Sequence, residues 1–263
     1  MEENPNTRTL LNKNAEEPPS PPSSYDIVVG AQPSGQHLPS AICTQPHFGN
    51  SNGAMNVPRQ IPNCPRGLEY LTTVDQLLIK QQVELGLDNR FVIKNAMGQN
   101  IYHADEDADC CAHLWCGSDR SFDMIITDNY DNRVMQFFRP TAIGFSDSIE
   151  VSAPIGQVIG RIVKQFDLVF PTFKVKNQYN ETVLYIEGPA ITTGFFGDVE
   201  FKVVKPDGVQ VGKICKQWSG LAREFFTYAD YFGINFPIDL DVRIKAVLLG
   251  ACLLINSIYY ERR

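Results

Sequence analysis

Carboxylates near the C-terminus are the side chains whose type and spacing most clearly suggest chemistry. Asp230, Asp239 and Asp241 lie around Gly233, directly before the most apolar stretch of the chain. Carboxylate and carbonyl oxygens are the ligands that a hard cation such as calcium prefers. The sequence therefore predicts a calcium-binding segment beside an apolar helix. In the alternative interpretation, Asp239 and Asp241 cap that helix and Asp230 is solvated.

A second group of potential ligands lies in the middle of the chain. Cys110, Cys111, His113 and Cys116 form the pattern C-C-x-H-x2-C, and thiolates with an imidazole suit zinc. The spacing matches no common zinc module, so ordinary packing is the alternative. The chain has seven cysteines, an odd number at irregular spacing. This is unlike a disulfide framework and predicts reduced thiols on a body that faces the cytosol.

Other chemistry is excluded by what the sequence lacks. It contains no G-x-S-x-G, no Walker loop, no zinc-protease helix and only four scattered histidines. We therefore expect no covalent catalysis. With 23 basic against 30 acidic residues, the chain is also not expected to bind nucleic acids in general. The N-terminus has no apolar segment of the kind found in cleavable signal peptides.

The first 65 residues differ from the rest in composition. They hold 11 of the 17 prolines, with polar residues between them and almost no apolar periodicity. Such a segment buries too little apolar surface to offset its ordering entropy, so we predict a disordered tail over 1–65 and one domain over 66–263. Pro18, Pro19, Pro21 and Pro22 give two overlapping P-x-x-P patterns, which could bind SH3-type or WW-type modules. An unadorned flexible tail is the alternative.

Mostly short strands are expected in the domain. Thr72 or Thr73 could cap a short helix, since Val74, Leu77 and Leu78 fall near helical spacing. After it, apolar residues alternate with polar ones in short segments separated by turn residues. The segments begin near Phe91, Ile101, Phe122, Val134, Val158, Phe173, Val183, Val199 and Val209. Many short strands in meander order predict an all-β barrel or sandwich.

A weak repeat supports closure into a single barrel. Phe91-Val-Ile-Lys-Asn95 is echoed by Phe173-Lys-Val-Lys-Asn177, and a turn and a second strand follow each. Two meander halves about 80 residues apart would cover each other's edges.

The C-terminal apolar segment allows two locations. We expect a helix over 242–260, capped by Asp239 or Asp241. The 15-residue apolar stretch from Ala246 to Tyr260, which Asn256 and Ser257 interrupt, would span roughly 22 Å, less than the roughly 30 Å of a bilayer core. The helix could therefore cross a membrane only marginally, or fill the inside of the barrel.

Several long motifs occur in one order: PRGLEYLTTVDQLLIKQQVEL, DADCCAHLWCG, GDVEFKVV, VGKICKQWSG and FGINFPIDLDVRIKAVLLGACLLI. On these motifs the chain resembles the phospholipid scramblase family over about 200 residues. The resemblance implies a 12-stranded tubby-like β-barrel enclosing a hydrophobic C-terminal α-helix. It also implies calcium-triggered, ATP-independent movement of phospholipids between membrane leaflets. The family is described both with this helix inside the barrel and with it as a membrane span below a cytoplasmic body.

The resemblance also assigns calcium ligands. The family's 12-residue calcium loop maps onto Tyr228 to Asp239, with Tyr228 where most members have Asp, so weak affinity is expected. The ligands implied are side chains or carbonyls of Asp230, Phe232, Ile234, Phe236, Asp239 and Asp241.

Further sites follow from the same likeness. The family's acylated cysteine run would fall at 141–147, where this chain has no cysteine, which leaves Cys110, Cys111 and Cys116 as alternative acylation sites. Residues 212–220 resemble an unusual nuclear import segment, in which Lys213, Lys216 and Trp218 would contact importin; a strand with a buried Trp218 and two surface lysines is the alternative.

Two functions remain open from sequence. The first is calcium-responsive scrambling at the cytoplasmic face of the plasma membrane, directly as a homo-oligomer or as a membrane-associated regulator. The second is a lipid-binding or protein-binding signalling adaptor that can enter the nucleus and moves no lipid.

Overall fold

The structure is a computed structural model that describes residues 53–59, 61–82, 90–107, 121–140, 147–167, 169–190, 199–217 and 231–260. The proline-rich tail therefore lies largely outside the described residues. Statements below concern the described part of the chain.

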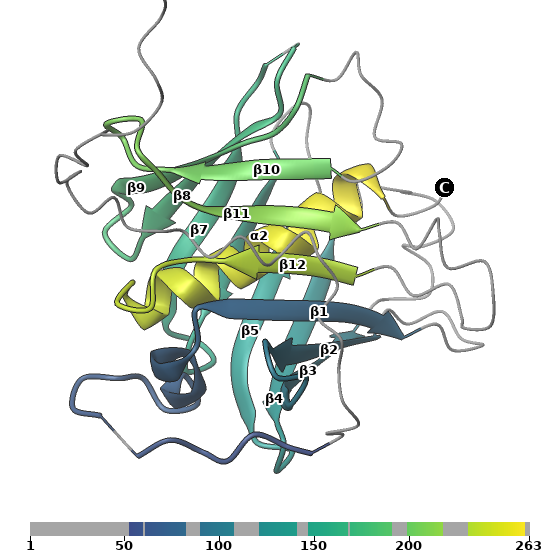
Figure 1. Cartoon of the computed structure of the whole chain (residues 1–263), viewed down its shortest axis with the longest axis vertical. Helices are drawn as coiled ribbons and strands as arrows, with labels where there is room; N and C mark the ends of the chain where they lie inside the picture. Colours follow the sequence, from purple (N-terminus) through teal and green to yellow (C-terminus); the bar gives the residue numbers. More distant parts are fainter. Residues whose placement is uncertain are drawn as a thin grey trace, which may run out of the picture. The chain divides into compact units, whose positions relative to one another are not determined.

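Twelve antiparallel strands form a closed barrel in meander order, shut by pairing of the first strand with the last (Figure 1). The strands are β1 (Gln76–Gln82), β2 (Arg90–Asn95), β3 (Asn100–Asp107), β4 (Phe122–Asp128), β5 (Arg133–Arg139), β6 (Ser148–Ser152), β7 (Val158–Lys164), β8 (Thr172–Asn177), β9 (Thr182–Glu187), β10 (Val199–Val204), β11 (Gln210–Gln217) and β12 (Tyr231–Asn235). The expected 12-stranded barrel is confirmed.

Alternation along the strands explains why the sheet closes around a core. In β10, Val199, Phe201 and Val203 are buried, whereas Glu200 and Lys202 are exposed. Side chains of a strand point alternately to its two faces, so the apolar set faces inward and the charged set faces water. Closure leaves no unpaired edge among the twelve described strands.

The short helix expected after Thr72 or Thr73 is wrong. A 3-10 helix, η1 (Glu69–Thr73), ends there, and Leu77 and Leu78 lie in strand β1. Leu77, Leu78 and Ile79 are all buried although they are consecutive. A strand without apolar and polar alternation cannot be distinguished from a buried helix by periodicity.

The repeat is confirmed at the turns of two hairpins. Asn95 Oδ1 accepts hydrogen bonds from the backbone N–H groups of Met97 and Gln99 between β2 and β3. Asn177 Oδ1 accepts the same pair of bonds from Tyr179 and Glu181 between β8 and β9. The two echoed segments therefore end in the same side-chain-stabilised turn.

Helix α2 (Val242–Tyr259) runs inside the barrel (Figure 1). Its 14 consecutive residues from Ile244 to Ser257 are buried, and it packs on β6, β7, β8, β12 and η1. Asp241 is its N-cap and accepts a 2.7 Å hydrogen bond from the backbone N–H of Arg243. Of the two locations that the sequence left open, the structure has the barrel interior.

Candidate functional site

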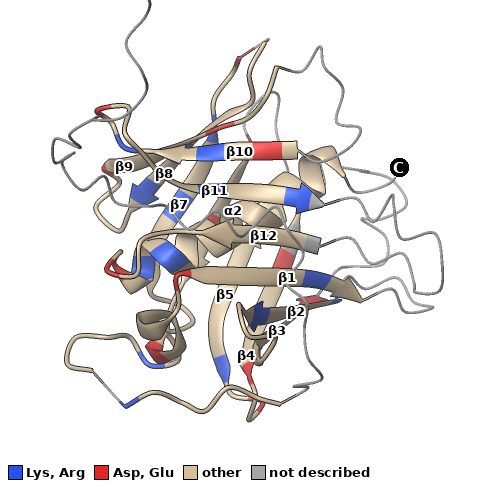
Figure 2. Cartoon of the chain, viewed as in Figure 1, with Lys and Arg blue, Asp and Glu red and all other residues tan. Residues whose placement is uncertain are grey.

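Helix α2 is held inside the barrel at both of its ends, and a buried cation holds the N-terminal end. Figure 2 shows charge on α2 only near this end, where Arg243 and Lys245 lie. Lys245 is completely buried. Its Nζ donates to the carbonyls of Leu71, Val74 and Ile238 at 2.9, 2.8 and 2.7 Å, and lies 5.1 Å from the centre of the Phe236 ring.

The protonation state of Lys245 matches this arrangement. Burial lowers the pKa of Lys245 to about 8, and the nearby carboxylates of Asp75 and Asp239 oppose that shift. The amine therefore remains mostly protonated at neutral pH, with three hydrogens for three carbonyls. In the unfolded chain this amine has the normal pKa of 10.5, so between about pH 8 and pH 10.5 the unfolded chain binds the proton and the folded chain does not. The contribution of Lys245 to the free energy of unfolding therefore increases as the pH rises from about 8 to 10.5.

A polar network holds the C-terminal end of α2. Arg139 in β5 is buried and donates to the hydroxyl of Ser257 on the helix and, at 2.8 Å, to Asp147. Lys164 in β7 donates to the other oxygen of Asp147 at 3.1 Å. Asp147 thus lies between two cations, one of which also contacts the helix. Buried charges need such partners because desolvation of each ion is costly.

Aromatic rings close this end of the barrel. Tyr259 lies 6.4 Å from Phe173 and 6.3 Å from Phe201, and Lys164 Nζ lies 5.5 Å from its ring centre. Lys216 Nζ lies 3.8 Å from the ring centre of Tyr260, within the range of a cation–π interaction. Burial raises the pKa of Tyr259 to about 12, with Asp147 adding to the shift, so its hydroxyl stays neutral at physiological pH.

Two glycines allow the helix to lie close to the barrel wall. A Cβ on Gly160 of β7 would lie 2.6 Å from Val247 Cγ2 and 2.5 Å from the carbonyl oxygen of Lys176. A Cβ on Gly250 of α2 would lie 2.9 Å from Val151 Cγ2 in β6. Neither position has room for a larger side chain, so the wall and the helix are matched in shape.

Replacement of Arg139 by Met tests the network. We expect the free energy of unfolding to fall by about 3 kcal/mol, because Asp147 and Ser257 lose a buried charged partner. Arg161→Met is the control, since Arg161 forms a 2.8 Å ion pair with Glu150 at a half-exposed position. It should cost less than about 1 kcal/mol. Equal effects of the two variants in urea titration would contradict a structural role for the network.

The residues predicted to bind calcium are only partly brought together. Tyr228 and Asp230 lie outside the described residues. Phe232 and Ile234 lie in β12, which pairs with β1 on one side and β11 on the other, so the expected loop contains a strand whose carbonyls face its neighbours. The backbone N–H of Phe236 donates to the backbone carbonyl of Asp75. Asp239 and Asp241 are exposed just before α2.

Calcium ligation stays a prediction. Among the described residues, no three His, Cys, Asp or Glu side chains lie close enough to hold a metal ion. The described carboxylates that could contribute are those of Asp239 and Asp241.

One of the three residues predicted to contact importin, Lys216, is buried in the structure. Lys213 in β11 forms a 3.1 Å ion pair with Glu200, but Lys216 is only 1% exposed, and Trp218 lies outside the described residues. The folded barrel therefore does not offer Lys216 to an import receptor. The alternative interpretation, a strand with Lys213 and Lys216 both on the surface, is wrong for Lys216.

The cysteine predictions fall mainly on parts of the chain that are not described. Cys110, Cys111 and Cys116 lie there, so neither acylation nor zinc is tested. Of the three cysteines that the structure describes, Cys64 and Cys252 are free thiols, whereas Cys215 is disulfide-bonded. The expectation of uniformly reduced thiols is therefore wrong for Cys215.

Comparison with known proteins gives a consistent result. A family model described as "Scramblase" matches residues 55–262, which include every strand of the barrel and α2. The chain belongs to the scramblase family. It is 41% identical to rat (Rattus norvegicus) phospholipid scramblase 1 over 92% of this chain and 76% of that protein. It is 43% identical to bovine (Bos taurus) phospholipid scramblase 2 over 80% of this chain and 79% of that protein.

Identity to human (Homo sapiens) phospholipid scramblase family member 5 is 39%, over 76% of this chain and 79% of the relative. No solved structure matches the chain. In this scramblase fold, α2 is the one described helix that is long and apolar enough to cross a membrane. The same helix fills the barrel, so the segment that could span a bilayer is the core of the domain.

Lys245 and Arg139 are site residues that sequence reasoning missed in this scramblase barrel. A lysine inside an otherwise apolar helix was a usable signal for Lys245, because a helical lysine in such surroundings needs buried acceptors. No local pattern marks Arg139 as buried.

Proposed function

We propose that this chain moves phospholipids between the two leaflets of a membrane without ATP, as a cytoplasm-facing protein at the plasma membrane. The observation that carries the proposal is the family match over the whole barrel and helix, together with relatives that are named phospholipid scramblases. Lipid movement down a gradient needs no covalent step. It needs a lower cost for carrying a charged headgroup through hydrocarbon.

The position of α2 inside the barrel limits the paths by which lipids could move. One apolar helix offers no polar path for a headgroup, and here its residues from Ile244 to Ser257 are already in contact with the barrel. We infer that α2 stays inside the barrel and that lipids pass along barrel surfaces, in an assembly of several copies. The closed barrel then acts on the membrane as a rigid body.

Calcium response is part of the proposal and depends on Asp239. This carboxylate is exposed in the connection between β12 and α2, and it lies near enough to Lys245 to influence its pKa. Isothermal titration should give calcium binding in the roughly millimolar range that is typical of weak extracellular-type loops. Absence of calcium heat at these concentrations would remove calcium from the proposal.

A leaflet-selective quench assay on liposomes tests the function. We expect purified wild-type protein to make inner-leaflet labelled lipid accessible to quencher, more so with calcium, and Asp239→Ala to reduce the calcium increment at least about threefold while folding is retained. Glu187→Ala, which removes an exposed carboxylate where β9 ends, at the opposite end of the barrel from Asp239, is the control. If wild-type protein leaves the inner-leaflet label protected with and without calcium, the proposed function is overturned.

The buried helix also favours a second candidate, a signalling adaptor that binds lipids or proteins and moves no lipid. Its proline-rich tail would bind SH3-type or WW-type modules, and entry into the nucleus would require an import signal that does not depend on the buried Lys216. Extraction of membranes with carbonate distinguishes a span from a surface-bound barrel. Release of the protein together with an inactive liposome assay would favour the adaptor.

A further inference from the structure

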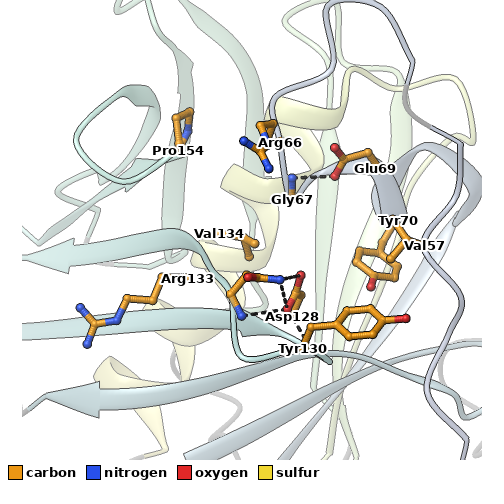
Figure 3. Close-up of a pocket in the computed structure, with 11 residues that line it drawn as sticks. Val57, Arg66, Gly67, Glu69, Tyr70, Asp128, Tyr130, Arg133, Val134 and Pro154 are labelled. Carbon is orange, nitrogen blue, oxygen red and sulfur yellow. Dashed lines mark hydrogen bonds between the residues drawn. The ribbon is translucent and has the colours of Figure 1, made fainter.

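A hollow of about 520 Å³ lies at the end of the barrel where α2 begins, between η1 and the turn from β4 to β5 (Figure 3). Its polar lining comes from Arg66, Glu69, Tyr70, Asp128, Tyr130, Asn132 and Arg133. These residues come from segments about 60 positions apart in sequence. The hollow is large enough for a small polar ligand and is separate from the contact between helix and barrel.

Charges of both signs line the hollow and balance. The lining contains two arginines, Arg66 and Arg133, and two carboxylates, Glu69 and Asp128. In Figure 3 the guanidinium of Arg66 lies near Gly67, whereas that of Arg133 points away. Within the described residues, the exposed Arg66 side chain has no hydrogen bond or ion pair. A neutral lining with separated positive and negative groups favours a ligand that itself carries both charges.

Tyr70 supplies a polar atom without a partner. The side chain is buried, and its hydroxyl lies within hydrogen-bond geometry of no partner among the described residues. The nearby amide of Asn129 donates instead to the carbonyl of Asn100 at 2.9 Å. Figure 3 shows the ring facing the side of the hollow that carries Asp128 and Tyr130. A buried hydroxyl without a protein partner at the wall of a hollow is available to hydrogen-bond a ligand there.

The carboxylates are already held in fixed positions. Glu69 Oε2 accepts a 2.6 Å hydrogen bond from the backbone N–H of Gly67. Asp128 Oδ1 accepts bonds from the backbone N–H groups of Tyr130 and Asn132 at 2.8 and 2.9 Å. The negative side of the hollow is therefore organised before any ligand binds, which reduces the entropy cost of binding.

The same end of the barrel presents apolar side chains to solvent. In a meander, alternate hairpin turns lie at one end, and the turns there carry Met97, Tyr130, Ile155 and Tyr179, all exposed. The backbone N–H groups of Met97, Tyr130 and Tyr179 each donate to the Asn or Asp that begins the turn. These side chains are thus held outward on rigid turns, as expected for a surface that contacts a membrane interface.

We propose that the hollow binds one zwitterionic phospholipid headgroup, with the phosphate at Arg66 and the Tyr70 hydroxyl and the ammonium against Tyr130 and Asp128. Arginine suits phosphate oxygens, and a cation over a tyrosine ring beside a carboxylate is stabilised by both. The exposed turns around the hollow place it at the bilayer surface. This inference deepens the proposed function and rests on it, since it names the lipid class that the barrel holds.

The first test uses a soluble zwitterion, glycerophosphoethanolamine, with the full-length protein and saturation-transfer NMR. The probe should bind at least about tenfold more tightly than inorganic phosphate or ethanolamine alone, because two linked contacts reinforce each other. Arg66→Gln should weaken binding by about tenfold or more, and Tyr70→Phe by about fivefold. Arg59→Gln, an exposed charge that does not line the hollow, should leave affinity unchanged.

Tyr70→Phe is the cleaner variant because it removes an atom that has no partner in the fold, so its thermal unfolding midpoint should not fall. Unchanged probe affinity in both Arg66→Gln and Tyr70→Phe would overturn the proposal. Equal affinity for inorganic phosphate would also overturn it, because the site would then select only an anion.

Vesicles of phosphatidylcholine and phosphatidylethanolamine distinguish the source of the headgroup. They should displace the soluble probe from wild-type protein, and Tyr70→Phe should bind them more weakly. Vesicles that leave the probe bound would show a site for soluble phosphodiesters and overturn the lipid assignment. If probe and vesicles bind while the liposome assay detects no lipid movement, the proposed function fails and the headgroup site stands.

Discussion

Replacement of Lys245 by Met should lower the free energy of unfolding by about 3 kcal/mol. Methionine has a similar length and recovers the desolvation cost that depresses the lysine pKa. It leaves the carbonyls of Leu71, Val74 and Ile238 without the donor that each now has. Because three acceptors, two of them in buried hydrogen bonds, lose a charged donor at once, the loss should exceed the recovered desolvation. Urea titration measures the change.

Arg243→Met provides the matched comparison two residues earlier on the same helix. Arg243 is partly exposed, donates to the carbonyl of Asn63 at 3.0 Å and lies 3.6 Å from Asp241. Its replacement should cost less than about 1 kcal/mol, as for other surface pairs. If Lys245→Met is no more destabilising than Arg243→Met, the buried amine does not hold the helix end.

The barrel was predictable from the sequence because its inner faces alternate with exposed ones. Strand β10 shows this pattern clearly, and the asparagines at 95 and 177 marked equivalent turns. The apolar composition of α2 indicated a buried or membrane-embedded helix but could not decide between them. Strand β1 was missed because three consecutive buried residues, Leu77 to Ile79, erase the alternation on which strand assignment depends.

The candidate sites were less predictable, for physical reasons. Lys245 binds carbonyls that lie 174 and 171 positions away in sequence, and a backbone acceptor can belong to any residue type. Lys216 looked like a surface charge, but it lies under the ring of Tyr260 at the end of the barrel. The hollow beside Tyr70 combines segments whose proximity follows only from barrel closure. Long-range contacts of this kind leave no local sequence pattern.

Gly160→Ala should destabilise the barrel strongly, because an added methyl has no room at this position. The added Cβ would lie 2.5 Å from the carbonyl oxygen of Lys176 and 2.6 Å from Val247 Cγ2. Both the pairing of β7 with β8 and the position of α2 must then shift. Overpacking of this degree should lower the free energy of unfolding by about 3 kcal/mol in urea titration.

The double variant Gly160→Ala/Val247→Ala turns this into a test of where the helix lies. Val247→Ala alone should destabilise the protein, because it leaves a cavity between helix and wall. In the Gly160→Ala background the same change removes one of the two clashes, so the two effects should be less than additive by about 1 kcal/mol or more. If α2 lay in the bilayer outside the barrel, Val247 would not contact Gly160, and the two substitutions would show no such coupling. Additive effects would therefore contradict a helix held inside the barrel, whereas coupling measured in the membrane-bound protein would show that α2 remains inside the barrel where the protein acts.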